Sequence, residues 1–204
     1  KVATIMTPLS KLVTVKEGFS QDDVMKLMYK NRIEKVLVVG EDDVLTGLVT
    51  MKDIEKSAQH PDATKDTSGR LQVGAALGTG VDTLDRAQAL YESGVDVYVI
   101  DSAHAHSKNV IDTIKKIKST FKDIDVIGGN IATSEAALEL VKAGADAVKV
   151  GMGPGSICTT RIIAGIGVPQ ISAILDIKNA LKKTDINIIA DGGIRFSGDI
   201  AKAI

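Results

Sequence analysis

The stretch Lys142-Ala143-Gly144-Ala145-Asp146-Ala147-Val148-Lys149-Val150-Gly151-Met152-Gly153 contains a helix end, a glycine stop, an apolar strand and a polar loop. Part of this order occurs earlier as well, in Glu92-Ser93-Gly94-Val95-Asp96-Val97. A glycine just after the last helical turn commonly ends a helix, and a short apolar run is typical of a strand in a parallel sheet. The repetition therefore predicts strands joined by helices, in a parallel sheet covered on both sides.

Strands and helices are expected to alternate through the rest of residues 71–204. Apolar runs predict five strands, at residues 71–77, 97–100, 126–127, 147–150 and 186–190. Between residues 110 and 121 the apolar positions step by four, three and four, which is a helical spacing. Helices are also expected over residues 83–94 and 134–143. This α/β pattern allows two closures, a (β/α)8 barrel or an open doubly wound sheet.

The polar segments decide between these closures, because each of them follows a predicted strand. They are Asp101-Ser102-Ala103-His104, Gly128-Gly129-Asn130, Gly151-Met152-Gly153 and Asp191-Gly192-Gly193. In (β/α)8 barrels the functional residues lie at the carboxyl ends of the strands. We therefore expect residues 71–204 to form part of a (β/α)8 TIM barrel, with its other strands supplied by sequence outside this chain.

Residues 1–57 have a different order of expected strands and helices, which predicts a small α+β unit. Ser20 is a candidate helix cap with Asp23 three residues later, and residues 35–39 and 44–50 read as strands on either side of a turn. A helix is expected to open at Met51. The polar residues 58–70 read as a linker to the barrel region.

The β-α-β-β-α order of residues 1–57, with Met6-Thr7-Pro8 at its start and Gly47-Leu48-Val49-Thr50-Met51-Lys52-Asp53 near its end, resembles a cystathionine-β-synthase-type (CBS) motif. The resemblance implies that Thr50 and Asp53 hold the ribose of a purine nucleotide. The alternative is that Thr50 ends a strand and Asp53 caps the next helix. CBS motifs work in pairs, so this one is expected to be the second of a pair.

Composition excludes several classes of protein. The formal net charge of −1 gives no support for a nucleic-acid surface, and no apolar run approaches the roughly 20 residues of a membrane span. The N-terminal residues lack the apolar core of a signal peptide. A single cysteine cannot form an intrachain disulfide, which is typical of a reducing compartment. We therefore expect a cytoplasmic protein.

That single cysteine, Cys158, lies in the loop Gly153-Pro154-Gly155-Ser156-Ile157-Cys158-Thr159-Thr160. A cysteine retained for packing is more commonly found among Leu and Val within a helix or strand. Glycines let backbone N–H groups approach an anion, and the serine hydroxyl adds a donor. The loop therefore predicts a thiolate nucleophile beside a phosphorylated substrate.

Other polar residues each have a functional and a structural reading. Asp191-Gly192-Gly193 suits a ribose diol and a phosphate, or else forms a tight turn in which Asp191 caps a helix. Asp101-Ser102 can likewise be an ordinary helix cap. His104 and His106 lack a clear third ligand, which disfavours a metal site. Lys149 is expected either to face the site or to be solvated.

Four of these segments together resemble the inosine-5′-monophosphate (IMP) dehydrogenase family. They are Gly153–Arg161, Gly167-Val168-Pro169-Gln170, Gly128-Gly129-Asn130 and Asp191-Gly192-Gly193-Ile194-Arg195. The resemblance covers nearly all of the chain. It implies an NAD-dependent oxidation of IMP to xanthosine monophosphate (XMP) in guanine nucleotide biosynthesis, through a covalent cysteine thioimidate. It also implies a homotetramer, which CBS pairs can join into an octamer.

The resemblance also implies a role for each matching residue. The catalytic residues would be Cys158, which attacks C2 of the purine, and Thr160, beside the hydrolytic water. The residues that hold IMP would be Ser156, Asp191, Gly192 and Gly193. The residues that contact NAD would be Asp101, Ser102, Ala103, Asn130, Gly151, Met152 and Gly153. The carbonyls that coordinate K⁺ would be those of Gly153, Gly155 and Cys158.

Some family features are not found in these 204 residues. The mobile flap with its water-activating arginine, further barrel strands and the first CBS motif are expected elsewhere, so this chain alone is expected to be an incomplete form of the enzyme. Ala105 stands where many relatives have glycine. Two alternatives stay open: GMP reductase, which uses NADPH, and a nucleotide-sensing protein with an inactive barrel. The CBS motif and the residues 162–170 favour the dehydrogenase.

Overall fold

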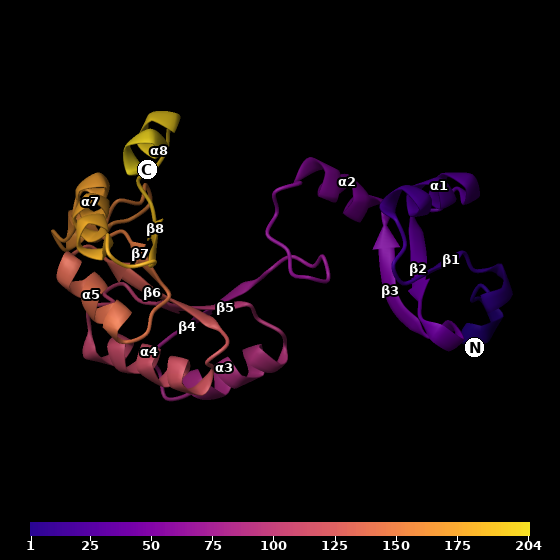
Figure 1. Cartoon of the computed structure of the whole chain (residues 1–204), viewed down its shortest axis with the longest axis horizontal. Helices are drawn as coiled ribbons and strands as arrows, with labels where there is room; N and C mark the ends of the chain where they lie inside the picture. Colours follow the sequence, from indigo (N-terminus) through magenta and orange to yellow (C-terminus); the bar gives the residue numbers. More distant parts are fainter. The chain divides into compact units, whose positions relative to one another are not determined.

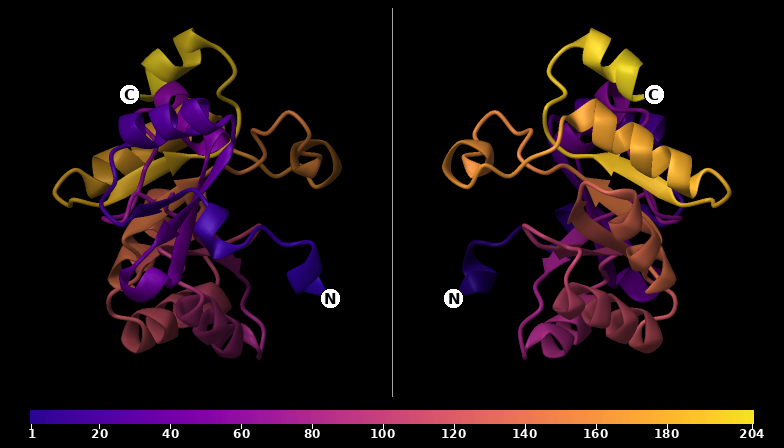
Figure 2. Two further views of the ribbon diagram at one scale, coloured as in Figure 1. Left: turned by 90° about the vertical axis from the view of Figure 1, so that its right-hand side faces the viewer. Right: turned by 90° about the vertical axis from the view of Figure 1, so that its left-hand side faces the viewer.

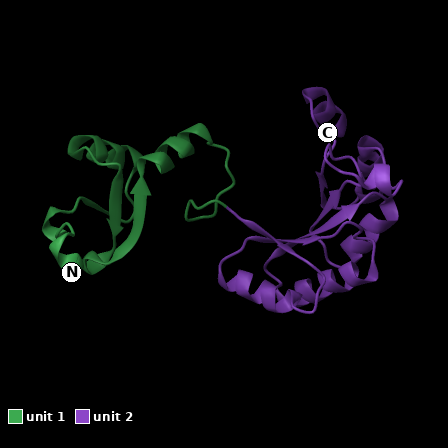
Figure 3. Ribbon diagram, turned by 180° about the vertical axis from the view of Figure 1, so that it is seen from behind, with its two compact units in different colours: residues 1–71 green, residues 72–204 purple.

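The computed structural model describes residues 1–204 and divides the chain into two compact units, Lys1–Leu71 and Gln72–Ile204 (Figure 3). Each unit has its own buried core. No helix in the chain is both long enough and apolar enough to cross a membrane.

The first unit is a three-stranded sheet with two helices. Strand β1 (Thr14–Lys16) pairs in parallel with β2 (Lys35–Val39), and β2 pairs in antiparallel fashion with β3 (Leu45–Thr50). Helices α1 (Gln21–Asn31) and α2 (Met51–Gln59) complete the predicted β-α-β-β-α order, and three short 3₁₀ turns lie at Val2–Thr4, Leu9–Lys11 and Glu41–Asp43. Helix α2 extends two residues into the segment expected to be linker.

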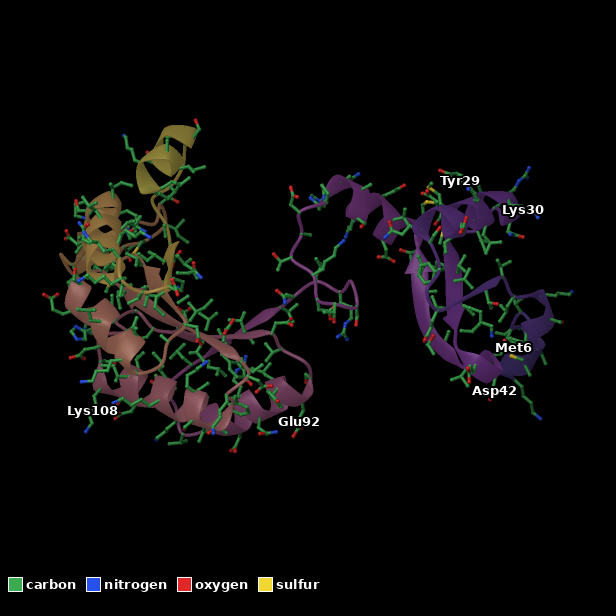
Figure 4. The ribbon with its side chains drawn as sticks, in the orientation of Figure 1. Met6, Tyr29, Lys30, Asp42, Glu92 and Lys108 are labelled. Carbon is green, nitrogen blue, oxygen red and sulfur yellow. The ribbon has the colours of Figure 1, made fainter.

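Helix α1 is amphipathic, and this fixes how it packs. Val24 and Met28 are fully buried against Val36 of β2 and Ile54 of α2. Tyr29 and Lys30 lie on the outer side of the helix (Figure 4). Ser20 caps the helix as predicted, because its hydroxyl accepts a hydrogen bond from the amide of Asp23 at 3.1 Å.

Thr50 and Asp53 form a reciprocal capping box at the start of α2. The Thr50 hydroxyl accepts from the Asp53 amide at 3.3 Å, and Asp53 Oδ2 accepts from the Thr50 amide at 2.9 Å and from its hydroxyl at 2.7 Å. These bonds, the side-chain bond first, hold the pKa of Asp53 below its ordinary value. The capping role is therefore present in the structure, whereas the nucleotide role of this pair stays a prediction.

Replacing Thr50 by alanine should loosen α2, because the first turn then loses a partner for an otherwise free amide. The expected loss is about 1 kcal/mol of local stability. Hydrogen exchange of the amides over residues 51–59 measures it. Thr50→Ser, which keeps the hydroxyl, is the matched control, and equal exchange in the alanine and serine variants would contradict the capping role.

The second unit is a five-stranded sheet in which every neighbouring pair is parallel. The strands are β4 (Gly74–Leu77), β5 (Val97–Asp101), β6 (Asp125–Ile131), β7 (Ala147–Val150) and β8 (Asn187–Ala190). They lie side by side in sequence order. A doubly wound sheet reverses its strand order at some point, so this uninterrupted order is the one consistent with part of a (β/α)8 barrel.

Helices cover one face of this sheet, as Figure 1 shows. They are α3 (Thr83–Glu92), α4 (Lys108–Thr120), α5 (Ser134–Lys142) and α7 (Gln170–Leu181). The short α6 (Thr160–Ile163) and α8 (Ser197–Ala203) lie in the segments that follow β7 and β8. Glu92 and Lys108, at the ends of α3 and α4, lie on the outer side of the helix layer (Figure 4).

The main core lies between the sheet and these helices. Along β5, Tyr98 and Ile100 are fully buried toward the helices, and the Tyr98 hydroxyl donates to the carbonyl of Ala87 at 2.6 Å. The alternate residues, Val97 and Val99, are only half-buried. The expectation of a sheet covered on both sides is therefore wrong for this chain. The half-buried positions belong to the face without helices.

Two predicted boundaries are also wrong, and one helix was missed. Gly128-Gly129-Asn130 was expected as a loop but lies within β6, whose pairing with β7 shifts between Gly129 and Ile131. The first strand of the sheet begins at Gly74 instead of Leu71. Helix α7 was not predicted at all, although it buries Ala173, Ile174, Ile177 and Leu181.

Candidate active site

Polar side chains from four neighbouring strand ends meet at one edge of the second unit. Asp101 ends β5, Asn130 and Lys149 lie near the ends of β6 and β7, and Asp191 follows β8. The pairing of the strands brings them together, because Asp101 is opposite Gly129 and Gly129 is opposite Lys149. The predicted gathering of these residues at the carboxyl ends of the strands is therefore present in the structure.

Lys149 is at the centre of this cluster and faces the site. Its ammonium donates to Asp101 Oδ1 at 3.1 Å, to Asp191 Oδ2 at 3.1 Å and to the side-chain oxygen of Asn130. Its side chain is 19% exposed. Sequence reasoning left the direction of Lys149 open, and the contacts settle it.

The side-chain amide of Asn130 is fully occupied within the protein. Its Nδ2 donates to the carbonyl of Gly151 at 2.9 Å and to Asp191 Oδ2 at 2.8 Å. The Asn130 bond, followed by the contacts with Lys149, holds the pKa of Asp191 below its ordinary value, against the opposing effect of burial. Asn130 thus holds the carboxylate of Asp191 ionised and in place.

The loop after β7 touches the loop after β8 through closely approaching backbones. A Cβ on Gly192 would lie 3.1 Å from the amide nitrogen of Gly155, and one on Gly193 would lie 3.1 Å from Cβ of Pro154. Both glycines have positive φ, at 83° and 78°, where other residues are strained. The expected Gly192-Gly193 turn is thus brought onto the cysteine loop.

A cavity of about 350 Å³ opens where these two loops meet. Its lining residues are Pro154, Ser156, Arg161, Pro169, Gln170, Gly193 and Arg195. Ser156 and Gly193, both predicted phosphate contacts, therefore line one hollow. The two arginines make that hollow positively charged, which suits a phosphate. Figure 2 shows the segment after β7 leaving the sheet and looping out before it enters α7.

Cys158 is half-buried in this loop, and its surroundings favour the thiolate. Its Sγ lies 3.3 Å from the Thr160 hydroxyl. Hydrogen bonds from the side chain and then the backbone of Thr160 lower the pKa of the thiol, and the charge of Arg161 adds a smaller effect. The thiolate is the nucleophilic form, so Thr160 increases the fraction of protein molecules in which the Cys158 thiol is ionised at neutral pH.

Replacing Thr160 by valine should raise the pKa of the Cys158 thiol, because the hydroxyl donor is lost. The rate of alkylation by iodoacetamide, followed against pH, reports this pKa, and its midpoint should move to higher pH. Thr159→Val is the matched control, since no side-chain contact joins Thr159 to the sulfur. A Cys158→Ala protein supplies the background rate. An unmoved midpoint in Thr160→Val would contradict this account.

Gln170 is a site-supporting residue that sequence reasoning missed. It is buried at 8% exposure, and its Nε2 donates to the carbonyls of Val150 at 2.8 Å and Asp191 at 3.3 Å. It therefore joins the ends of β7 and β8. The available signal was its place in the family-matching segment Gly167-Val168-Pro169-Gln170, to which no role was assigned.

The predicted residues near β5 are less closely tied to the cluster. The Ser102 backbone pairs with Gly129 and Asn130, while its hydroxyl accepts from the His104 amide at 3.3 Å. Ala105 is fully buried and its amide donates to the carbonyl of Asn130, so the protein accommodates alanine there. His106 lies 3.2 Å from Glu139, and no group of three or more His, Cys, Asp or Glu side chains is placed to hold a metal.

The oxygen donors expected for K⁺ fit that ion by their chemistry, because hard cations prefer oxygen ligands. They are the carbonyls of Gly153, Gly155 and Cys158 in the cysteine loop. The carbonyl of Gly155 accepts the amide of Cys158 at 3.1 Å in this loop conformation. A bound ion would therefore share that oxygen.

These features define the class of the second unit: an α/β protein with a parallel sheet, whose charged residues and lone cysteine lie at the carboxyl ends of the strands. The family model described as "IMP dehydrogenase / GMP reductase domain" matches residues 12–204. The chain belongs to this family.

Individual relatives match the whole of this chain. It is 55% identical over 203 residues to inosine-5′-monophosphate dehydrogenase of Aquifex aeolicus, covering 100% of this chain and 41% of that protein. The Pasteurella multocida dehydrogenase is also 55% identical over 203 residues, covering 100% of this chain and 42% of that protein. This chain thus spans about two fifths of the length of these curated relatives.

A solved structure is similar over almost the whole chain. It is the crystal structure of GMP reductase from Trypanosoma brucei in complex with guanosine 5′-triphosphate, with a TM-score of 0.80 and 45% identity. The match covers 99% of this chain and 48% of that one. A protein named as a reductase therefore contains a counterpart of residues 1–57, so the argument that this unit favours the dehydrogenase is wrong.

Proposed function

We propose that this chain is part of an NAD-dependent IMP dehydrogenase, an oxidoreductase that converts IMP to XMP in guanine nucleotide biosynthesis. The observation that carries the proposal is the meeting of the cysteine loop with the Gly192-Gly193 turn. The cysteine loop carries both Ser156 and a half-buried thiol of lowered pKa, and a basic cavity opens where this loop meets the turn. The cavity would bind the phosphate of a nucleotide substrate, and the thiolate would supply a nucleophile for its base.

The nucleotide would be held across that contact. Ser156, Gly192 and Gly193 would bind the phosphate through a hydroxyl and backbone N–H groups. Asp191 would accept hydrogen bonds from the ribose hydroxyls, since one of its oxygens is held by Asn130 and Lys149 while its side chain stays 47% exposed. The purine would then extend toward Cys158.

The chemistry would take two steps, each balanced in atoms and electrons. The Cys158 thiolate adds to C2 of the hypoxanthine, and the hydrogen on C2 leaves with its electron pair, which gives a thioimidate. NAD⁺, when bound, accepts that hydride. Water near Thr160 then attacks C2, the C2–S bond breaks, and XMP, the Cys158 thiolate and one proton are released. Splitting the reaction in this way is the usual benefit of a covalent nucleophile.

The dinucleotide would lie on the β5 side of the cluster. Asp101 has a side chain that is 54% exposed and one oxygen without a protein partner, so it can accept from a ribose hydroxyl. Ser102, Ala103 and the Gly151–Gly153 segment would supply further contacts. Asn130 would contribute mainly by positioning Asp191, because its own amide is occupied.

The second candidate function is that of GMP reductase, favoured by the T. brucei structure. Identity is higher to the curated dehydrogenases, at 55%, than to that reductase, at 45%. The cofactor and the direction of the reaction separate the two. The full-length protein should form NADH from IMP and NAD⁺, seen at the nicotinamide absorbance band. Turnover of GMP with NADPH, and none of IMP with NAD⁺, would overturn the proposal.

Three further features extend the proposal. K⁺ would be held by the carbonyls of Gly153, Gly155 and Cys158, and residues 1–57 would act as a CBS motif that binds a purine nucleotide at Thr50 and Asp53. A homotetramer, or an octamer joined by CBS pairs, would be the working assembly. Heat of binding for ATP or GTP tests the CBS role in the full-length protein, and its loss in Asp53→Ala would assign the site.

A further inference from the structure

Lys149 joins two carboxylates that the proposed function assigns to different ligands. We propose that Lys149 is a positioning residue that presents one oxygen of Asp191 to the nucleotide and one oxygen of Asp101 to the dinucleotide, and so couples the binding of the two. The inference rests on the proposed function, and it concerns a residue to which that function gives no role of its own.

Lys149 fixes one oxygen on each of the two carboxylates. Lys149 holds Oδ1 of Asp101 and Oδ2 of Asp191, each at 3.1 Å, and no hydrogen bond within the protein reaches the other oxygen of either carboxylate. Both carboxylates are about half exposed, at 54% and 47%, whereas the lysine side chain is only 19% exposed. Each carboxylate thus has one oxygen fixed by the protein and one available to a ligand.

The ammonium of Lys149 is fully occupied by acceptors within the protein. It has three N–H donors, and three acceptors surround it: Asp101, Asn130 and Asp191. No donor is left for a ligand, so Lys149 acts on ligands through its neighbours. A group this fully engaged cannot move toward one carboxylate without weakening its contact with the other.

Lys149 also offsets the repulsion between two like charges. Two carboxylates share one ammonium, so the trio has a net charge of −1, and without Lys149 the carboxylates would repel each other. A ribose that donates to Asp191 fixes that carboxylate and the lysine with it. Asp101 is then ordered before the dinucleotide arrives, so the dinucleotide binds more tightly. By linkage, bound dinucleotide must lower the Kd of the nucleotide by the same factor.

The test uses full-length protein carrying Cys158→Ala, which can hold IMP and NAD⁺ together without turnover. Calorimetry measures the Kd of IMP with and without saturating NAD⁺. We expect NAD⁺ to tighten IMP binding at least about fivefold, which is the lower end of ordinary coupling. In Lys149→Met the ratio should fall to within twofold of one. Lys149→Arg, which keeps the charge, should retain part of the coupling.

Lys178→Met is the matched control, since Lys178 is an exposed residue of α7 without an ion pair, and its coupling ratio should equal that of the parent. If Lys149→Met fails to fold by circular dichroism, Lys149→Gln replaces it. A parent ratio near one, or an unchanged ratio in the uncharged variant, would overturn the inference. Failure of the parent to bind IMP at all would instead overturn the proposed function.

Discussion

Replacing Cys158 by alanine should lower kcat for IMP oxidation by at least about 10⁴-fold, because loss of a covalent nucleophile costs this much or more in well-studied enzymes. Thr160 and Arg161 lower the pKa of the Cys158 thiol. The thiol is therefore the strongest nucleophile in the cysteine loop, whose other candidates are hydroxyl groups that are not ionised at neutral pH. NADH formation by the full-length protein, at saturating IMP and NAD⁺, measures the loss.

Two controls separate lost chemistry from lost structure. Cys158→Ala should retain the circular dichroism spectrum and thermal midpoint of the parent, because the side chain is half-buried in a loop outside both cores. Its Kd for IMP should change by less than about tenfold, since the phosphate and ribose contacts come from other residues. Turnover within tenfold of the parent would exclude Cys158 as the nucleophile.

Replacing Gly151 by alanine should destabilise the second unit by about 3 kcal/mol, at the upper end of overpacking effects. An added Cβ would lie 2.1 Å from the carbonyl oxygen of Asp191. The position of a Cβ is fixed by its own backbone, and the Asp191 oxygen is itself a backbone atom, so neither can rotate away. The Gly151 amide also donates to Ile131 and the Asp191 amide to Val150, so any shift strains the ends of β6, β7 and β8 together.

Urea unfolding, monitored by hydrogen exchange of the amides in the second unit, measures this loss of free energy. Gly78→Ala is the matched control, because Gly78 follows β4 in the same way but has nothing within 4 Å of an added Cβ. That change should stay within about 0.5 kcal/mol of the parent. Equal stability of the two variants would show that the strand ends relax more easily than the structure indicates.

The sequence predicted the elements best where periodicity was strong. The helical spacing between residues 110 and 121 corresponds to α4, and the apolar run at 147–150 matches β7 at both ends. Boundaries failed where glycine obscured the pattern. Gly128-Gly129 resembles a loop, yet a Cβ on Gly129 would lie 2.5 Å from that of Lys149, so glycine is required there for two strands to pair closely.

For the site, the sequence could name residue types but not their contacts. Asp101, Asn130 and Asp191 were recognisable because each follows an apolar run, and parallel strands end at a common edge. The central role of Lys149, which joins them, was not predictable, because the direction in which its side chain points depends on strand register. Gln170 was missed for a related reason. Its helix was not predicted, although Ile174, Ile177 and Leu181 step by three and four, and the contacts of its amide depend on how that helix meets the ends of β7 and β8.

The uninterrupted strand order of the second unit has a consequence for how the protein is made. Within this chain, each strand from β4 to β7 pairs with the strand that follows it, so none of these four pairings has to wait for a distant segment. Pairing with the next strand keeps each contact as local as a parallel sheet allows, because only one helical connection has to be closed each time. On the ribosome, each newly emerged strand therefore finds its partner already present, and the sheet can grow at the pace of translation.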